Sequence, residues 1–241
     1  LLDLERLGTT ATADEITDTS VTQPLVVAAT LLAFEELTKR GTLNGKDAVV
    51  AGHPGGEITA YAIAGVISAD DAVKLAATRG AEMAKACALV PTGMAAVLGG
   101  DRDAVLALLD ELALTPANHN GAGQIVAAGA LDALAELAAH PVPASRVIPL
   151  QVAGAFHTHH MRPAVGPLQE LARGLEPAGE AQLPVEPGVQ QRTAVHLDGG
   201  LQPVGPALQL RDAPARGIDQ VHRVIAHDVV HIAFQQHMRV Q

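Results

Sequence analysis

Aromatic residues are scarce in this chain of 241 residues. They make up 2% of the sequence, and there is no Trp. Because 48% of the residues are nevertheless hydrophobic, we expect a core built from Ala, Val, Leu and Ile. The length suffices for one large domain or two small ones and for a sizeable core.

Further absences indicate the cellular compartment and exclude some classes of partner. The net charge is -10 and no basic cluster occurs, which argues against a nucleic-acid partner. The single cysteine, Cys87, excludes an internal disulfide framework and fits a reducing compartment. No signal-peptide pattern is visible, and the longest apolar run, residues 25–34, is shorter than the ~20 residues that cross a bilayer. We therefore expect a cytoplasmic protein with no membrane partner.

The first part of the chain has the pattern of an α/β unit. Pro24 fits a first helical turn, Gly41 fits a helix end, and Ser68 fits an N-cap. The expected elements are helices over 25–39, 58–66 and 72–87, a short helix beginning near residue 14, and a short buried strand over 47–51.

The next part predicts a strand–helix–strand–strand–helix–strand order. The expected strands are 93–98, 116–120, 124–128 and 146–152, and the expected helices are 101–112 and 131–139. This βαββαβ order is typical of a ferredoxin-like subdomain. After about Leu175, glutamines and prolines crowd the sequence, and strand patterns are weak until residues 221–232.

A glycine-rich turn, Gly52-His53-Pro54-Gly55-Gly56-Glu57, follows the expected strand and opens the next helix. Such a turn is where α/β enzymes place a nucleophile, in the pattern Gly-x-Ser-x-Gly. The frame is intact here, but its central residue is Pro54, which has neither a nucleophilic side chain nor an N–H. By spacing alone, an ordinary strand–turn–helix with tight packing is an equally good interpretation.

The turn and several later blocks resemble the malonyl-CoA:acyl carrier protein transacylases, whose elbow reads Gly-His-Ser-x-Gly-Glu. The resemblance covers roughly residues 10–170 and weakens after about residue 175. The other blocks that carry it, in order, are Thr22-Gln23-Pro24, Arg79-Gly80 with Met83, Pro91-Thr92-Gly93-Met94, Asn118-His119-Asn120 with Gln124-Ile125-Val126, and Gly154-Ala155-Phe156-His157-Thr158. The family's Gly-Gln-Gly stretch is absent and the chain begins with Leu1, so we expect its N-terminus to be missing.

The resemblance implies a role for five positions. Position 54 is that of the nucleophile, His157 that of its general base, and the Gly55 N–H one oxyanion donor. Arg79 is implied to hold the malonyl carboxylate, because a planar guanidinium makes two parallel hydrogen bonds to it. Phe156, a bulky ring beside the base, favours malonyl over methylmalonyl, although one methyl group is worth only ~1–3 kcal/mol.

The implied reaction moves malonyl from malonyl-CoA to the thiol of an acyl carrier protein in fatty-acid biosynthesis. It uses no cofactor. Two alternatives stay open: a catalytically inactive relative or fragment, because Pro54 replaces the serine, and an acyltransferase domain of a polyketide synthase. We predict no metal site, because no acidic or Cys ligand is suitably spaced near the clustered histidines. These histidines are His157, His159 and His160, and the i, i+4 pair His227 and His231.

The predicted fold is therefore α/β. We expect a large hydrolase-like α/β subdomain, formed by residues 1–90 and 158–175, with an inserted ferredoxin-like small subdomain over residues 91–157. Residues 176–241 are expected to be a divergent tail of uncertain structure.

Overall fold

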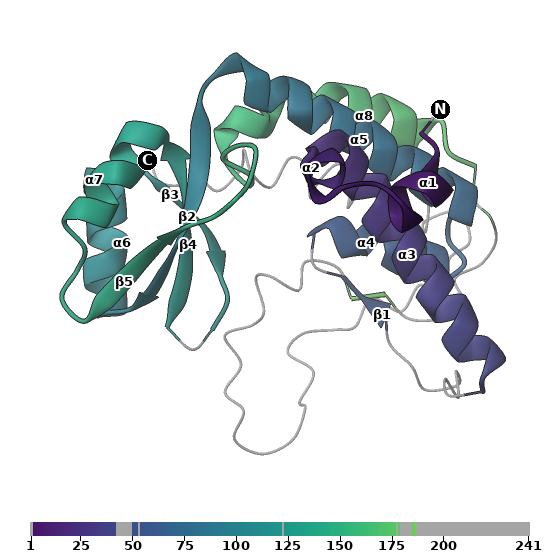
Figure 1. Cartoon of the computed structure of the whole chain (residues 1–241), viewed down its shortest axis with the longest axis horizontal. Coiled ribbons are helices and arrows are strands. Elements are labelled where there is room, and N and C mark those ends of the chain that lie inside the picture. Colours follow the sequence, from purple (N-terminus) through teal and green to yellow (C-terminus); the bar gives the residue numbers. More distant parts are fainter. Residues whose placement is uncertain are drawn as a thin grey trace. The chain divides into compact units, whose positions relative to one another are not determined.

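The computed structural model describes residues 2–41, 50–52, 54–121, 123–176, 178 and 185–186. They belong to two compact units (Figure 1). Unit 1 contains residues up to Glu82 and again residues from Val165 onward, and the described part of unit 2 is Met83–Ala164. The predicted domain bounds, 1–90 with 158–175, 91–157 and 176–241, stay predictions.

Unit 1 consists mainly of helices. Its elements are α1 (Leu4–Thr9), α2 (Ala13–Thr17), α3 (Thr19–Lys39), β1 (Val50–Ala51), α4 (Pro54–Ile63), the first part of α5 (Ala69–Leu89), α8 (Val165–Arg173) and β6 (Val185–Glu186). A 3₁₀ helix at the end of the described part of unit 2, His159–Ala164, precedes α8. The short helix expected near residue 14 is α2, whereas α1 has no counterpart among the predicted elements.

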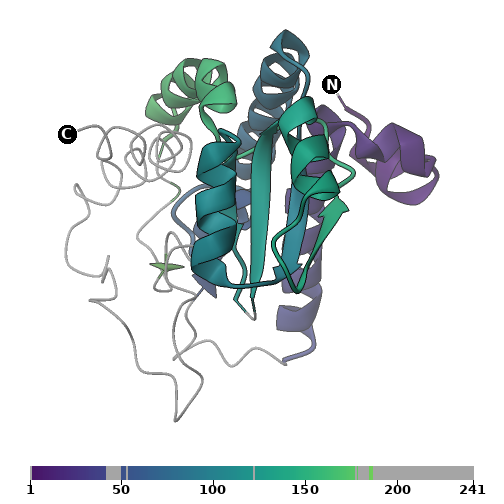
Figure 2. The same ribbon diagram turned by 90° about the vertical axis from the view of Figure 1, so that its left-hand side faces the viewer.

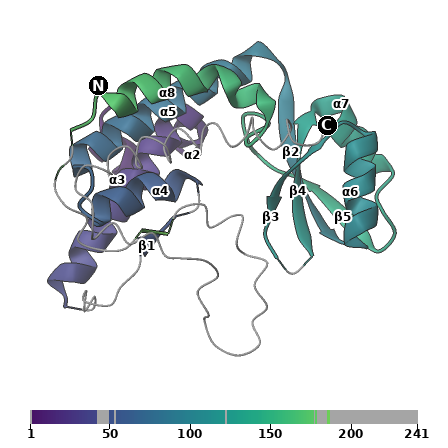
Figure 3. The ribbon, with the colours of Figure 1, turned by 180° about the vertical axis from the view of Figure 1, so that it is seen from behind.

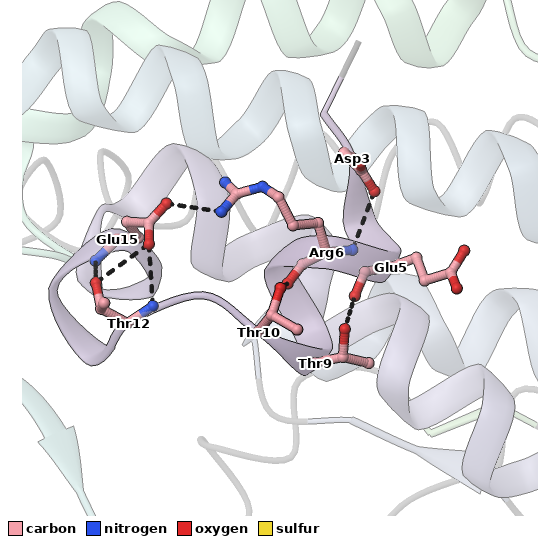
Figure 4. Close-up of polar contacts among 7 residues, drawn as sticks. All are labelled: Asp3, Glu5, Arg6, Thr9, Thr10, Thr12 and Glu15. Atoms are coloured by element: carbon pink, nitrogen blue, oxygen red, sulfur yellow. Dashed lines mark hydrogen bonds and ion pairs between the residues drawn. The ribbon is translucent and has the colours of Figure 1, made fainter.

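Side-chain caps define the short helices at the start of the chain (Figure 4). Thr12 and Glu15 form a capping box at α2, in which each side chain bonds the backbone N–H of the other residue. Glu15 also accepts a hydrogen bond from Arg6 on α1, with 2.9 Å between Nη1 and Oε1. The backbone bond from Thr12 and the contact with Arg6 lower the pKa of Glu15.

Helix α3 begins six residues before the predicted start at residue 25. Asp18 caps it by accepting from the backbone N–H of Ser20 at 2.7 Å, so Pro24 lies inside the helix rather than in its first turn. The predicted end is confirmed, because Arg40 is the C-cap and Gly41 has a φ of +68°.

Helix α3 extends beyond the apolar run of residues 25–34 at both ends. Its 21 residues are long and apolar enough to cross a membrane by length and composition, with a mean hydropathy of 1.2 over an 18-residue window. The core helix of a soluble protein passes the same test, so these two properties alone do not distinguish the cases.

The predicted strand before the glycine-rich turn is present as β1, whose described residues are Val50 and Ala51. It pairs in parallel with β6, with Val50 opposite Val185 (Figure 3). Residues 47–49 lie outside the described residues, as does the segment 221–232. Helix α4 was predicted to begin at Ile58 but begins at Pro54, because Gly55 and Gly56 continue the helix instead of forming the turn.

Unit 2 contains the predicted βαββαβ order. Its elements are β2 (Thr92–Gly99), α6 (Arg102–Glu111), β3 (Thr115–His119), β4 (Gln124–Ala130), α7 (Leu131–Ala139) and β5 (Ser145–Pro149). The four strands form an antiparallel sheet in the order β3-β4-β2-β5. Strand β5 ends at Pro149, three residues before the predicted end, and Gly121 and Gly123 take positive φ in the hairpin between β3 and β4.

The two faces of this sheet have different surroundings. Helices α6 and α7 cover one face (Figures 1 and 2). The core there is apolar and is made of Ala95, Val97, Val105, Leu109, Leu114, Ile125, Ala127, Leu134 and Leu137. On the other face Met94, Val126 and Ala128 pack against Ala155, with Phe156 beside them. The sheet therefore supports the loop that carries the predicted general base.

Candidate functional site

The glycine-rich turn depends on a close backbone approach at Gly52. A Cβ atom at Gly52 would lie 2.1 Å from the carbonyl carbon of Gly56 and 2.3 Å from the nitrogen of Glu57. Real Cβ atoms do not approach backbone this closely, so only glycine fits here. Gly52, directly after β1, therefore packs against the backbone of the first turn of α4.

Pro54, the predicted nucleophile position, is the first residue of α4. Proline is favoured at this position because its missing N–H would have no partner inside the helix. Gly55 follows it in the first turn, where backbone N–H groups have no acceptor within the helix. Such groups and the helix dipole stabilise negative charge, which is the chemistry that an oxyanion donor requires.

Arg79 lies on α5 and is held from α3. Its Nη1 donates to Oε1 of Gln23 at 2.5 Å. The two helices approach closely because residue 80 is glycine: a Cβ at Gly80 would lie 2.5 Å from the carbonyl oxygen of Thr19 and 3.1 Å from the Cβ of Gln23. The Gln-Pro and Arg-Gly blocks of the sequence therefore meet in the fold.

The charge on Arg79 depends on its surroundings. Burial lowers the pKa of Arg79 to about 10, and the negative charge of Glu57 acts in the opposite direction. Glu57 lies on α4 and is 3% exposed. Its charge and, above all, burial raise the pKa of Tyr61, one turn later on the same helix. Arg79 is therefore a cation at neutral pH, as a carboxylate-binding residue must be.

His157 and Phe156 lie on one loop of unit 2. His157 is half-buried and has a φ of +60°, in the left-handed region that side-chain-bearing residues rarely adopt. Phe156 packs beside Met94 and Ala155, against the face of the sheet that α6 and α7 do not cover. The structure thus places the predicted base and the predicted specificity residue side by side in sequence on a supported turn.

Two threonines hold this loop. The hydroxyl of Thr92, at the start of β2, accepts from the backbone N–H of Ala155 at 3.0 Å. The hydroxyl of Thr158, which is 1% exposed, donates to the Ala155 carbonyl at 2.7 Å and accepts from the N–H of His160 at 3.2 Å. These bonds keep the backbone around His157 in its unusual conformation.

The predicted site residues fall into two groups. Pro54, Gly55 and Arg79 belong to unit 1, and Phe156 and His157 belong to unit 2. Within unit 1, the Gln23 amide oxygen bonds Arg79 and would be 3.7 Å from a Cβ at Gly55, so Gln23 lies between the two. Sequence reasoning noted the block around Gln23 but assigned it no role. The glycine beside Arg79 was the available signal, because glycine within a helix often marks a close contact.

The histidine clusters do not suggest a metal centre in the described part of the chain. Across its described residues there is no group of three or more His, Cys, Asp or Glu side chains that would hold a metal ion. The rings of His159 and His160 lie 4.1 Å apart, tilted by 34°. Burial and the neighbouring His159 lower the pKa of His160. His227 and His231 lie outside the described residues, and the expected absence of a metal stays a prediction.

Known proteins resemble this chain in sequence and in fold. The malonyl CoA-acyl carrier protein transacylase of Mycolicibacterium smegmatis is 72% identical over 164 residues, which are 68% of this chain and 56% of that protein. The crystal structure of MCAT from Mycobacterium tuberculosis is 50% identical and superposes with a TM-score of 0.77, covering 100% of this chain and 74% of that one. The structure of a type II PKS acyl-carrier protein in complex with its malonyl-transacylase contains a matching chain, with 26% identity and a TM-score of 0.74. The match covers 94% of this chain and 68% of that one.

The chain spans about half the length of the curated relatives that it matches. The acyl transferase domain model matches residues 5–181, which contain all five predicted site residues. The contact of Gly52 with α4, the Arg79 cation and the His157 loop lie within that match, and the chain belongs to the acyl transferase domain family.

Proposed function

We propose that this chain is the core of a malonyl-CoA:acyl carrier protein transacylase of fatty-acid biosynthesis. The single observation that carries the proposal is the buried Arg79 cation, held by Gln23 close to the start of α4. A guanidinium fixed beside a helix N-terminus suits an acyl group that ends in a carboxylate. The curated relatives bear the transacylase name, so a polyketide synthase domain is not favoured.

The proposed reaction exchanges an acyl group twice. First, a hydroxyl oxygen at position 54 bonds to the thioester carbonyl carbon, the carbon–sulfur bond breaks, and coenzyme A leaves as the thiol after His157 relays the proton. Second, the carrier thiol attacks the ester, and the hydroxyl is restored. The Gly55 N–H stabilises the oxyanion in both steps. Phe156 limits the room beside the base, which favours malonyl over a branched acyl group.

Because residue 54 is proline in this sequence, the chain cannot carry out the first of these steps. Proline has no hydroxyl, so no ester forms at position 54. The backbone still favours a helix start at this residue. We therefore expect the chain to bind malonyl-CoA without being acylated, and to become acylated once a serine stands at position 54.

The test compares three proteins with radiolabelled malonyl-CoA: the parent chain, Pro54→Ser, and Pro54→Ala as a matched control without a hydroxyl. We expect a covalent malonyl label on Pro54→Ser alone, and loss of that label when holo acyl carrier protein is added. A folded Pro54→Ser that takes up no label would overturn the proposed function. A label on the parent chain would overturn position 54 as the acylated residue.

The finer architecture belongs to the same proposal. The antiparallel strand order β3-β4-β2-β5, with two helices on one face, supports a ferredoxin-like small subdomain. The parallel β1–β6 pair followed by the turn into α4 supports a hydrolase-like large subdomain. A cytoplasmic location and the lack of a bound cofactor, with malonyl-CoA as substrate and an acyl carrier protein as partner, complete the proposal.

A further inference from the structure

One contact in unit 1 connects the proposed carboxylate-binding residue to a helix far away in sequence. Gln23 on α3 and Arg79 on α5 are separated by 56 residues, and the hydrogen bond between them measures 2.5 Å. A guanidinium carries only donors, so the oxygen of the Gln23 amide must face it. The direction of this bond is therefore fixed by chemistry.

A neutral acceptor has a specific advantage at this position. Glu57 already places one negative charge near Arg79, whereas Gln23 uses one N–H of Arg79 and adds no further charge. A guanidinium has five N–H donors. Donors remain for the two parallel bonds to an incoming carboxylate. A glutamate at position 23 would instead form an ion pair and compete with that carboxylate for the same cation.

The surrounding backbone is built to keep this contact. Asp18 fixes the start of α3 through the backbone N–H of Ser20, and Pro24, next to Gln23, is fully buried. Gly80 lets the α3 backbone approach α5 more closely than any side chain would allow. The Gln23 amide also lies near Gly55, the proposed oxyanion donor. Gln23 therefore sets the direction of the Arg79 side chain relative to the start of α4.

We propose that Gln23 is a positioning residue that aims the Arg79 guanidinium at the acyl carboxylate and so sets the preference for malonyl over acetyl thioesters. This inference rests on the proposed function, because it presupposes that the site takes malonyl-CoA. It adds a determinant of acyl-group choice that acts through Arg79.

The experiment measures equilibrium binding of malonyl-CoA and of acetyl-CoA to the full chain by calorimetry. Pro54 makes this measurement simple, since no ester is expected to form. The variants are Gln23→Met, which keeps the side-chain length but removes the acceptor, and Gln23→Glu, which keeps the acceptor but adds a charge. Gln169→Ala, on α8 of the same unit, is the control.

We expect the parent chain and Gln169→Ala to bind malonyl-CoA more tightly than acetyl-CoA. Gln23→Met and Gln23→Glu should each lose roughly tenfold in malonyl-CoA affinity, with acetyl-CoA affinity unchanged. A general loss of structure would weaken both ligands equally, so the ratio of the two affinities isolates the positioning role. Should Gln23→Met fail to fold, Gln23→Glu alone decides.

The two proposals fail in different ways. If the parent chain shows no preference for malonyl-CoA, the proposed function is overturned and this inference falls with it. If the parent chain prefers malonyl-CoA and the folded Gln23 variants keep that preference, the inference is overturned while the proposed function stands. Equal losses for both ligands would likewise overturn the positioning role.

Discussion

At the scale of single residues, His157 occupies a backbone conformation that its side chain disfavours. Its φ of +60° places it in the left-handed region, which costs a residue with a Cβ roughly 1–2 kcal/mol relative to glycine. The bonds made by Thr92 and Thr158 to the neighbouring residues offset this cost. A strained residue that the surroundings hold in place is a common feature of functional sites.

This conformation predicts an unusual order of stability. We expect His157→Gly to be more stable than His157→Ala by about 1 kcal/mol in urea unfolding, because only the glycine relieves the strain. At an ordinary helical position the order reverses, so Ala107→Gly on the exposed side of α6 should cost about 1 kcal/mol. Equal stabilities of the two His157 variants would contradict the strained conformation.

At the scale of elements, the crossing of α3 and α5 links stability to selectivity. The contact needs a glycine at position 80, since a Cβ there would lie 2.5 Å from the Thr19 carbonyl oxygen and 3.0 Å from the Cα of Ser20. Both are backbone atoms, which cannot move without shifting the start of α3. A shift of that helix would carry Gln23 away from Arg79.

We predict that Gly80→Ala lowers the free energy of unfolding by about 1–3 kcal/mol and also weakens the preference for malonyl-CoA over acetyl-CoA. Gly166→Ala on α8 is the matched control, because its Cβ would meet no atom of the described residues within 4 Å. Urea unfolding and calorimetry measure the two effects. A Gly80→Ala protein as stable and as selective as the control would contradict this prediction, because it would show that a Cβ at position 80 fits between α3 and α5.

Sequence reasoning succeeded where the determinants of an element are local. Helix α7 has the predicted bounds of residues 131–139, and the order of helices and strands along unit 2 follows from periodic apolar segments and the glycines between them. The predicted starts of α3 and α4 were late, because Pro24 was interpreted as a first-turn residue and Gly55 and Gly56 as part of a turn. In both cases the surroundings override the local preference of glycine or proline.

The candidate site was predictable only in part. Arg79 and His157 follow from blocks that resemble a known family. The Gln23–Arg79 bond did not follow, because the two residues lie on different helices and no local pattern relates them. The strain at His157 could not be predicted either, since it arises from the hydrogen bonds of Thr158 and Thr92 and not from the histidine itself.

At the scale of the whole molecule, the two units differ in how the chain builds them. The described part of unit 2 is one continuous stretch, Met83–Ala164, whereas the described part of unit 1 comes from segments on both sides of it. The helix-covered core of unit 2 lies entirely within that stretch, and Leu109 and Leu137 are fully buried there. Unit 2 therefore contains the residues that its own core needs.

We predict that residues 83–164, expressed separately, fold cooperatively, although a unit of about eighty residues is close to the lower limit for a single core. Circular dichroism during urea unfolding and dispersed amide NMR signals provide the measurement. Leu109→Ala should cost ~2–5 kcal/mol and abolish the transition, whereas Leu131→Ala, 53% exposed, should leave it nearly unchanged. A featureless spectrum of the parent fragment would contradict this prediction.

The parallel pairing of β1 with β6 has a consequence for the order of events during synthesis. Val185 leaves the ribosome roughly 135 residues after Val50, which takes on the order of ten seconds at usual translation rates. During that interval β1 has no partner strand, and residues 83–164 of unit 2 are synthesised before the interval ends. The nascent chain therefore contains the sheet that supports the histidine loop before strand β1 can pair with β6.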